Sequence, residues 1–171
     1  MQYQISYLSP LGHAEKLAAA FERMLPSDTM TINLDDESDA RGEIHLVGFE
    51  LGSKMDAIPY KILEFLEKLD EKIIFLFATC LIPSIESVKE RAERAVVPFL
   101  PEDCDYRGLF MCRGQASKQF MMELENFAQQ QPYNEKAKVW LSQCKKSEGH
   151  PNREDLRQAC RFAAEILELN I

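Results

Sequence analysis

The sequence lacks the features that mark membrane, secreted and nucleic-acid-binding proteins. No apolar run approaches the roughly 20 residues that cross a bilayer, and no basic segment followed by a long apolar stretch opens the chain. We therefore expect no membrane span and no signal peptide, and a cytoplasmic location. The 28 acidic and 20 basic residues give a formal net charge of −8. This charge argues against nucleic acid as a partner, because its phosphates require a basic protein face.

Recognisable metal, disulfide and catalytic patterns are also missing. The five cysteines (Cys80, Cys104, Cys112, Cys144 and Cys160) are odd in number, and no two have CxxC spacing. We expect free thiols, buried or half-buried, rather than a disulfide framework or a zinc site. No nucleophile elbow and no dinucleotide-binding glycine fingerprint occurs. The sequence thus predicts no metal ligand and no catalytic acid or base.

A regular alternation of strands and helices runs along the chain instead. We expect strands at QYQISYL, DTMTINL, EIHLVGF, KIIFLFAT and YRGLFMC, and helices at 14–25, 57–69, 84–97, 116–130, about 134–144 and about 152–169. Apolar residues recur with helical spacing in the helices. The unbroken apolar run from Ile73 to Ala78 is typical of a strand buried on both faces of a parallel sheet. This order predicts one doubly wound α/β domain over residues 1–171, with helices on both faces of a five-stranded parallel sheet.

Two connections have a definite character. Residues 34–42 are short and acidic, so they leave little room for a full crossover helix. Their acids form either a solvated loop or an acidic rim for docking. Asn152 precedes the last helix and Asp155 follows three residues later. An Asn side chain can cap the first free N–H groups, and an acid in the first turn suits the helix dipole.

Three loops should meet at the carboxyl end of the sheet, where open parallel sheets bind ligands. The first, SPLGHA at 9–14, runs from a strand into a helix, so its backbone N–H groups can form a concave anion site. The other two, GFELGSKMD at 48–56 and ATCLIP after the fourth strand, offer mostly apolar walls. Such walls suit a flat heteroaromatic ring better than a sugar or a metal.

Several segments resemble the flavodoxin family, over nearly the whole chain. They read YLSPLGHAEKLA, LVGFELGSKMDAIPYKILEFLEKLDEKIIFLFATC, GLFMCRG and HPNREDLRQACRFAAEIL. The resemblance implies a sheet of order 2-1-3-4-5 that binds FMN, with the phosphate on the first loop and the ring between the other two. The cofactor-binding residues it implies are Ser9, Pro10, Leu11, Gly12, His13, Ala14, Phe49, Glu50, Leu51, Gly52, Thr79, Cys80 and Leu81.

The first loop departs from the family's Ser/Thr-x-Thr-Gly-Asn-Thr pattern. Ser9 and Gly12 match it, whereas Leu11 and Ala14 replace hydroxyl residues and His13 replaces the amide. Two phosphate hydrogen bonds are lost, each worth about 1.5–3 kcal/mol to a charged acceptor. A protonated His13 would return part of that affinity, since a phosphate beside it would raise its pKa. We therefore expect weak or lost FMN binding.

The other two loops leave alternatives open. Glu50 stands where related proteins often have tryptophan. It is either a solvated loop acid or a charge that repels a reduced flavin. Phe49 either contacts the ring or, more simply, packs against the helix at 57–69. Cys80 is either a contact of the ring edge or an inert thiol. Outside the loops, we expect His45 to be a core or helix-facing histidine with its hydrogen bonds satisfied, and His150 to serve either a site or a structural cap.

The resemblance favours an FMN-dependent electron carrier that docks onto a partner oxidoreductase. Two alternatives remain: a flavin-poor accessory protein that uses the flavodoxin surface for binding, and a small FMN-dependent reductase. The redox partner, the potential, the substrate and the oligomeric state stay open.

Overall fold

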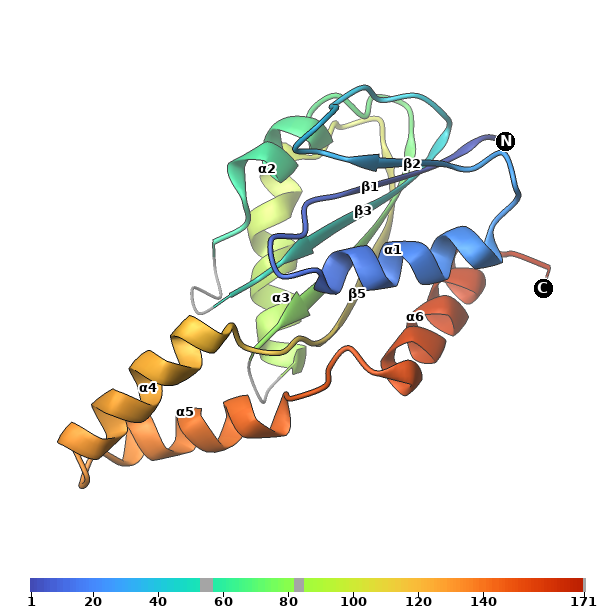
Figure 1. Cartoon of the computed structure of the whole chain (residues 1–171). Helices are drawn as coiled ribbons and strands as arrows, with labels where there is room; N and C mark the ends of the chain where they lie inside the picture. The colour runs from blue at the N-terminus through green and yellow to red at the C-terminus, as the bar shows by residue number, and fades with distance from the viewer. Residues whose placement is uncertain (53–56, 82–84, 171) are drawn as a thin grey trace.

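Five parallel strands form one sheet at the centre of the molecule (Figure 1). We obtained a computed structural model that describes residues 1–52, 57–81 and 85–170. The strands are β1 (Tyr3–Tyr7), β2 (Met30–Asn33), β3 (Ile44–Glu50), β4 (Ile73–Cys80) and β5 (Asp105–Arg113). Their order is β2-β1-β3-β4-β5 and every neighbouring pair is parallel. The predicted α/β fold and strand order are confirmed.

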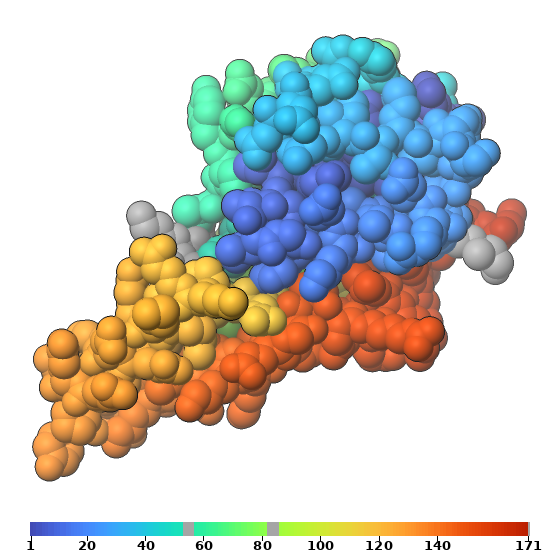
Figure 2. Space-filling view, in the orientation of Figure 1, coloured from blue at the N-terminus to red at the C-terminus, as the bar shows by residue number. Residues whose placement is uncertain are grey.

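Helices cover both faces of this sheet (Figure 1). One face packs against α1 (His13–Met24) and α6 (Arg153–Ile166), and the other against α2 (Tyr60–Leu66) and α3 (Ile85–Val96). Between β5 and α6 the chain forms α4 (Lys118–Gln130) and α5 (Glu135–Lys146), which pair as a hairpin. This hairpin, called the helical arm below, projects from the body (Figure 2). A 3₁₀ turn, Val97–Phe99, follows α3.

The alternation of side chains along β3 assigns its residues to the two faces. Leu46 belongs to the buried cluster beneath α1 and α6, whereas Val47 and Phe49 belong to the cluster beneath α2 and α3. A strand sends successive side chains to opposite faces, so Gly48 and Glu50 lie on the α1 face with Leu46. At Gly48 a Cβ would stand 2.2 Å from the Phe77 ring. Only glycine fits there without displacing that ring.

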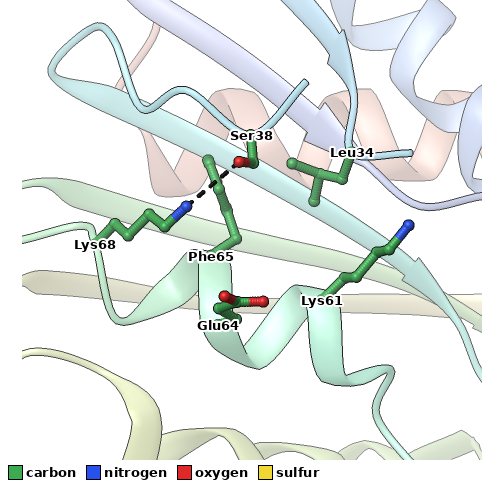
Figure 3. Close-up of a pocket in the computed structure, with 6 residues that line it drawn as sticks. All are labelled: Leu34, Ser38, Lys61, Glu64, Phe65 and Lys68. Atoms are coloured by element: carbon green, nitrogen blue, oxygen red, sulfur yellow. Dashed lines mark hydrogen bonds between the residues drawn. The ribbon is translucent and has the colours of Figure 1, made fainter. Parts of the chain in front are cut away.

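The acidic connection between β2 and β3 contains no helix, as its length predicts. Its acids are exposed, and Asp35 pairs with Lys61 of α2 at 2.6 Å. A small pocket lies between this connection and α2 (Figure 3). The residues that line it are Leu34, Ser38, Lys61, Glu64, Phe65 and Lys68. The pocket contains none of the residues predicted to bind a cofactor.

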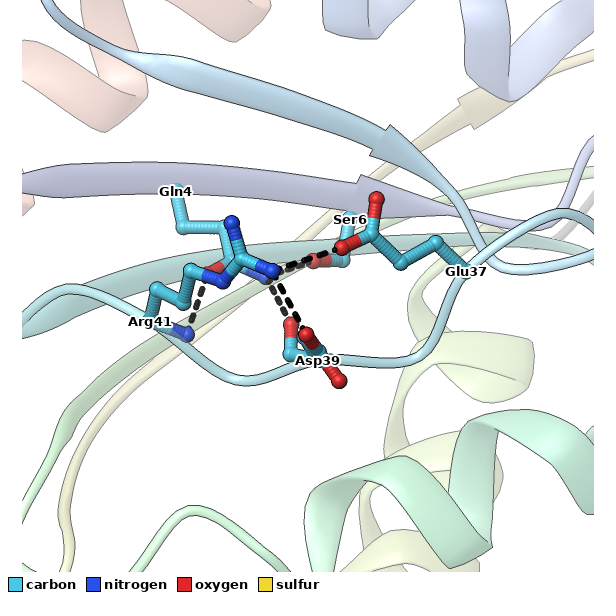
Figure 4. A network of polar contacts seen from close by, with 5 residues as sticks. All are labelled: Gln4, Ser6, Glu37, Asp39 and Arg41. Carbon is cyan, nitrogen blue, oxygen red and sulfur yellow. Dashed lines mark hydrogen bonds and ion pairs between the residues drawn. The ribbon is translucent and has the colours of Figure 1, made fainter.

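A buried glutamine fixes the same connection to the sheet (Figure 4). Gln4 of β1 is fully buried; its Nε2 donates to the Ser6 hydroxyl at 2.9 Å and to the Asp39 carbonyl at 2.8 Å. Its Oε1 accepts from the Arg41 N–H at 2.6 Å. The Arg41 guanidinium pairs with Glu37 and Asp39 at 3.1 and 2.6 Å. The acids are therefore exposed on the surface, and Arg41 and Lys61 partly neutralise them.

The burial of the cysteines and the cap of α6 agree with the sequence predictions. No disulfide joins the five cysteines, all of which lie in the described part of the chain; three are buried and two half-buried. Asn152 and Asp155 form a reciprocal capping box at the start of α6. Within residues 1–52, 57–81 and 85–170, no helix is long and apolar enough to cross a bilayer.

Candidate functional site

The loop from β1 to α1 gathers hydrogen-bond donors around one point. Gly12 has φ of +81°, the left-handed region that favours glycine, and it precedes the first turn of α1. Its N–H closes a turn on the Ser9 carbonyl at 3.2 Å. The N–H groups of Leu11, His13 and Ala14 and the Ser9 hydroxyl point into the concave side of this turn. We call these four donors the anion cradle.

The side chain of Glu50 fills the anion cradle. Its Oε2 accepts from the Ser9 hydroxyl at 2.7 Å, from the His13 N–H at 2.7 Å and from the Ala14 N–H at 3.0 Å. Its Oε1 accepts from the Leu11 N–H at 2.7 Å. Glu50 is only 7% exposed. The expectation that it is a solvated loop acid is therefore wrong.

Two elements of regular structure bring this carboxylate to the loop. The carboxyl ends of neighbouring parallel strands lie at the same edge of a sheet, and β1 and β3 are neighbours, with the Leu8 N–H bonded to the Gly48 carbonyl at 3.0 Å. The strand β3 also runs one residue further than the sequence predicts, to Glu50. Its alternation then directs the side chain toward α1. The sequence would have indicated this contact only if the third strand had been extended by one residue, to Glu50.

The donors are suited to a full negative charge. A helix N-terminus carries a partial positive charge, and hydrogen bonds from N–H groups to a carboxylate are short and roughly twice as strong as neutral ones. The three contacts at 2.7 Å fit that class. Among the described residues, no ion pair of Glu50 with a lysine or arginine occurs. The charge is thus stabilised mainly by backbone dipoles and one hydroxyl, which itself accepts from the Glu15 N–H at 3.0 Å.

His13 contributes its backbone rather than a charge. Burial lowers the pKa of its imidazole; the nearby Glu50 opposes that effect only in part, and Lys16 adds to it. A Cβ at Gly114 would lie 2.5 Å from the His13 Nδ1, so the ring packs against the chain just after β5. The proposed protonated His13 is therefore not favoured in this arrangement.

The residues predicted to line a ring are mostly packed into cores. Phe49 and Leu51 are 0% and 2% exposed and belong to the cluster beneath α2 and α3. Thr79 and Cys80 are each 1% exposed. Leu81 packs with residues of the helical arm. Packing is therefore the structural role of Phe49. Gly52 is half-buried, and residues 53–56 and 82–84, which complete both loops, lie outside the described residues.

The other histidines do not join this site. His45 is fully buried in β3; its Nε2 lies 3.4 Å from the Gly42 carbonyl and its Nδ1 has no hydrogen-bond partner. The prediction of fully satisfied hydrogen bonds is therefore wrong for His45. Burial lowers its pKa to about 4. His150 bonds to the Asp155 carboxylate at 2.6 Å, beside the capping box that Asp155 forms with Asn152 at the start of α6. In the described part of the chain, no group of three His, Cys, Asp or Glu residues could hold a metal ion.

The donors of the anion cradle are suited to a phosphate group, but the Glu50 carboxylate occupies them. Four donors converge on one anion, as a phosphate group would require. The same four donors are already used by Glu50, and a phosphate dianion cannot share them with a carboxylate. As the residues stand, the loop does not fit the FMN phosphate. It would fit only after Glu50 has left.

Comparison with known proteins places this fold in one family. The model of the Flavodoxin domain matches residues 4–164. A short-chain flavodoxin associated with a non-canonical PDU bacterial microcompartment is 11% identical with a TM-score of 0.58, covering 98% of this chain and 97% of that one. The flavodoxin of Streptococcus pneumoniae TIGR4 is 14% identical with a TM-score of 0.55, covering 98% and 99%. No curated protein matches the chain. The chain therefore belongs to the flavodoxin domain family, in which FMN is the typical cofactor and electron transfer the typical function.

Proposed function

We propose that the protein is an FMN-dependent electron carrier that docks onto a larger oxidoreductase. The single observation that carries the proposal is the anion cradle, four donors at the carboxyl edge of a flavodoxin-type sheet. When FMN is bound, the flavin supplies the redox chemistry. The chain's own residues supply the donors for its phosphate: the Ser9 hydroxyl and the N–H groups of Leu11, His13 and Ala14.

Weak affinity for FMN is part of this proposal. Only molecules in which Glu50 has left the anion cradle can receive the phosphate, and the apparent affinity falls by the fraction of such molecules. The missing hydroxyls at Leu11 and Ala14 lower the affinity further. A carrier of this kind exchanges its cofactor more readily than one that holds it with a full set of donors.

The helical arm supports the docking part of the proposal. Four large apolar residues of the arm are exposed: Met122, Phe127, Tyr133 and Val139. Exposed apolar side chains on a projecting element can contribute contacts to a partner protein. Figure 2 shows the arm standing clear of the body, where a partner can reach it. The formal net charge of −8 suits a partner with a basic face.

Parallel titrations with FMN and riboflavin test the cofactor. The two ligands share the ring and differ in the phosphate, so a preference for FMN measures what the anion cradle contributes. The proposal expects quenching of flavin fluorescence by the protein, with FMN bound more tightly than riboflavin. Absence of FMN binding would refute it. Oxidation of NAD(P)H by the loaded protein without a partner would point to a reductase instead.

A second candidate is a flavin-poor accessory protein that binds a partner enzyme through the same surface. The observation that favours it is the full occupation of the anion cradle by Glu50. This candidate expects a colourless protein that resists loading even with excess FMN. It also expects that a partner enzyme binds wild-type protein equally well with and without added flavin.

A further inference from the structure

We propose that Glu50 is a built-in anionic ligand that closes the anion cradle to free oxyanions, and that the cradle binds inorganic phosphate once this carboxylate is removed. The proposal concerns the anion site itself and holds whether or not the protein carries FMN. It assigns to Glu50 the part of an autoinhibitory contact within the binding site.

The contacts identify the carboxylate as a ligand and not simply as a neighbour. Both oxygens are engaged, and the four donors come from residues 36 to 41 positions away in the chain. The Glu50 side chain is buried at 7% exposure, and its Oε2 alone accepts three of the four bonds. One carboxylate with this many donors reproduces the coordination of a bound oxyanion.

The turn itself holds the four donors in place, without help from the Glu50 carboxylate. Gly12 adopts a left-handed conformation, and its N–H bonds to the Ser9 carbonyl within the loop. The α1 helix then continues from this turn, with the Lys16 N–H bonded to the Gly12 carbonyl at 3.3 Å. These bonds do not involve Glu50. Removing the carboxylate therefore leaves a preformed set of free donors at the start of a helix of 12 residues.

A tethered carboxylate is a strong competitor for free anions. A ligand held in the same molecule acts at an effective concentration of millimolar or more. A free phosphate must displace it and also approach its negative charge. Wild-type protein should therefore bind inorganic phosphate at least about tenfold more weakly than a variant without the carboxylate, which is about 1.4 kcal/mol.

The test compares phosphate binding by wild-type protein and two variants, measured by titration calorimetry at constant ionic strength. Glu50→Ala empties the anion cradle, and Glu50→Gln keeps the shape while removing the charge. Glu15→Ala is the matched control, because it removes an acid from the first turn of α1 that does not occupy the cradle. We expect a gain in phosphate affinity of at least about tenfold for Glu50→Ala, a smaller gain for Glu50→Gln, whose amide still occupies the cradle, and none for the control.

Thermal unfolding supplies a second readout that requires no activity. Free donors left by Glu50→Ala should lower the midpoint of unfolding, and phosphate should restore it by mass action. Wild-type protein and Glu15→Ala should show no such dependence on phosphate beyond that on chloride. In Glu50→Ala, adding Ser9→Ala should weaken the recovery, because it removes one donor of the cradle.

Three outcomes would overturn the proposal. The first is that wild-type protein binds phosphate as tightly as the variants. The second is that neither variant gains affinity for phosphate, and the third is that both variants stay unfolded at saturating phosphate. In the last case the carboxylate would be an irreplaceable part of the fold and no free anion could substitute for it. If Glu50→Ala binds phosphate but neither FMN nor riboflavin, the proposed electron carrier fails and the closed anion site stands.

Discussion

The fully buried His45 should make the protein sensitive to acid in a defined pH range. Its ring lies in β3, 6.1 Å from the Phe65 ring of α2, with Nδ1 unpaired and Nε2 3.4 Å from the Gly42 carbonyl. Burial is the largest cause of its low pKa; the Gly42 carbonyl opposes this in part, and Lys72 lowers the pKa by a smaller amount. The folded protein therefore holds a neutral imidazole over most of the acidic range.

The size and sign of the effect follow from the two pKa values. The unfolded chain takes up a proton on His45 near pH 6.5, and the folded protein only near pH 4. Between these values the unfolded state binds one more proton, so the free energy of unfolding falls as the pH is lowered. The stabilisation is complete above pH 6.5 and is lost by about pH 4. The loss is about 3 kcal/mol, since one pKa unit is worth about 1.4 kcal/mol.

Urea unfolding from pH 7 to pH 4 checks this reasoning, with His45→Leu as the comparison. Carboxylates titrate in the same range in both proteins, so the difference between the two curves isolates the histidine. The variant should be at least as stable at pH 7, because an unpaired buried nitrogen is removed. Its advantage should grow by about 3 kcal/mol toward pH 4. Two parallel curves would refute the assigned burial and pKa of His45.

Four further variants test the site and its surroundings. Glu50→Trp should leave FMN binding no tighter than in wild-type protein, because an indole at residue 50 would stand in the anion cradle that the phosphate needs, and tighter binding in a fluorescence titration would contradict this. Phe49→Ala should cost about 3–5 kcal/mol of stability in urea unfolding, as for a core side chain; a purely functional loss would contradict its burial. Gly114→Ala should destabilise by about 1–3 kcal/mol, because its Cβ would meet a histidine ring at 2.5 Å; unchanged denaturant midpoints would argue against that contact. Leu11→Thr with Ala14→Thr should tighten FMN binding in a Glu50→Ala background and have little effect in wild-type protein. If the two threonines change the FMN affinity equally in both backgrounds, their hydroxyls do not act through the phosphate.

The fold was predictable because it depends on patterns that extend over many residues. The apolar run from Ile73 to Ala78 and the helical spacing of the helices each repeat one signal several times. The sheet edge that brings the three loops together follows from parallel strand order. Tertiary packing then adjusted the ends, as at α2, which is shorter than the predicted helix at 57–69.

The contents of the site depended on single residues and were harder to predict. The Glu50 contact required knowing that β3 includes residue 50, and an error of one residue reverses the face on which a side chain lies. If β3 ended at Phe49, Glu50 would be the first residue of the following loop and would be expected to face solvent. The side chain of His13 was likewise interpreted from its residue type alone, whereas its burial against the chain near Gly114 is a tertiary contact.

Gly48 has no side chain, and this affects how closely α1 packs on the strand that ends at Glu50. On the α1 face of β3, the Phe77 ring covers the backbone at Gly48 and meets the Phe21 ring of α1 edge-on, with ring centroids 5.0 Å apart. Strand β3 therefore presents no side chain of its own between Leu46 and Glu50 on that face. A methyl group at residue 48 would push the Phe77 ring, and the Phe21 ring that contacts it, away from β3. The bare backbone at Gly48 thus lets α1 pack closely on the strand whose last residue, Glu50, reaches the anion cradle.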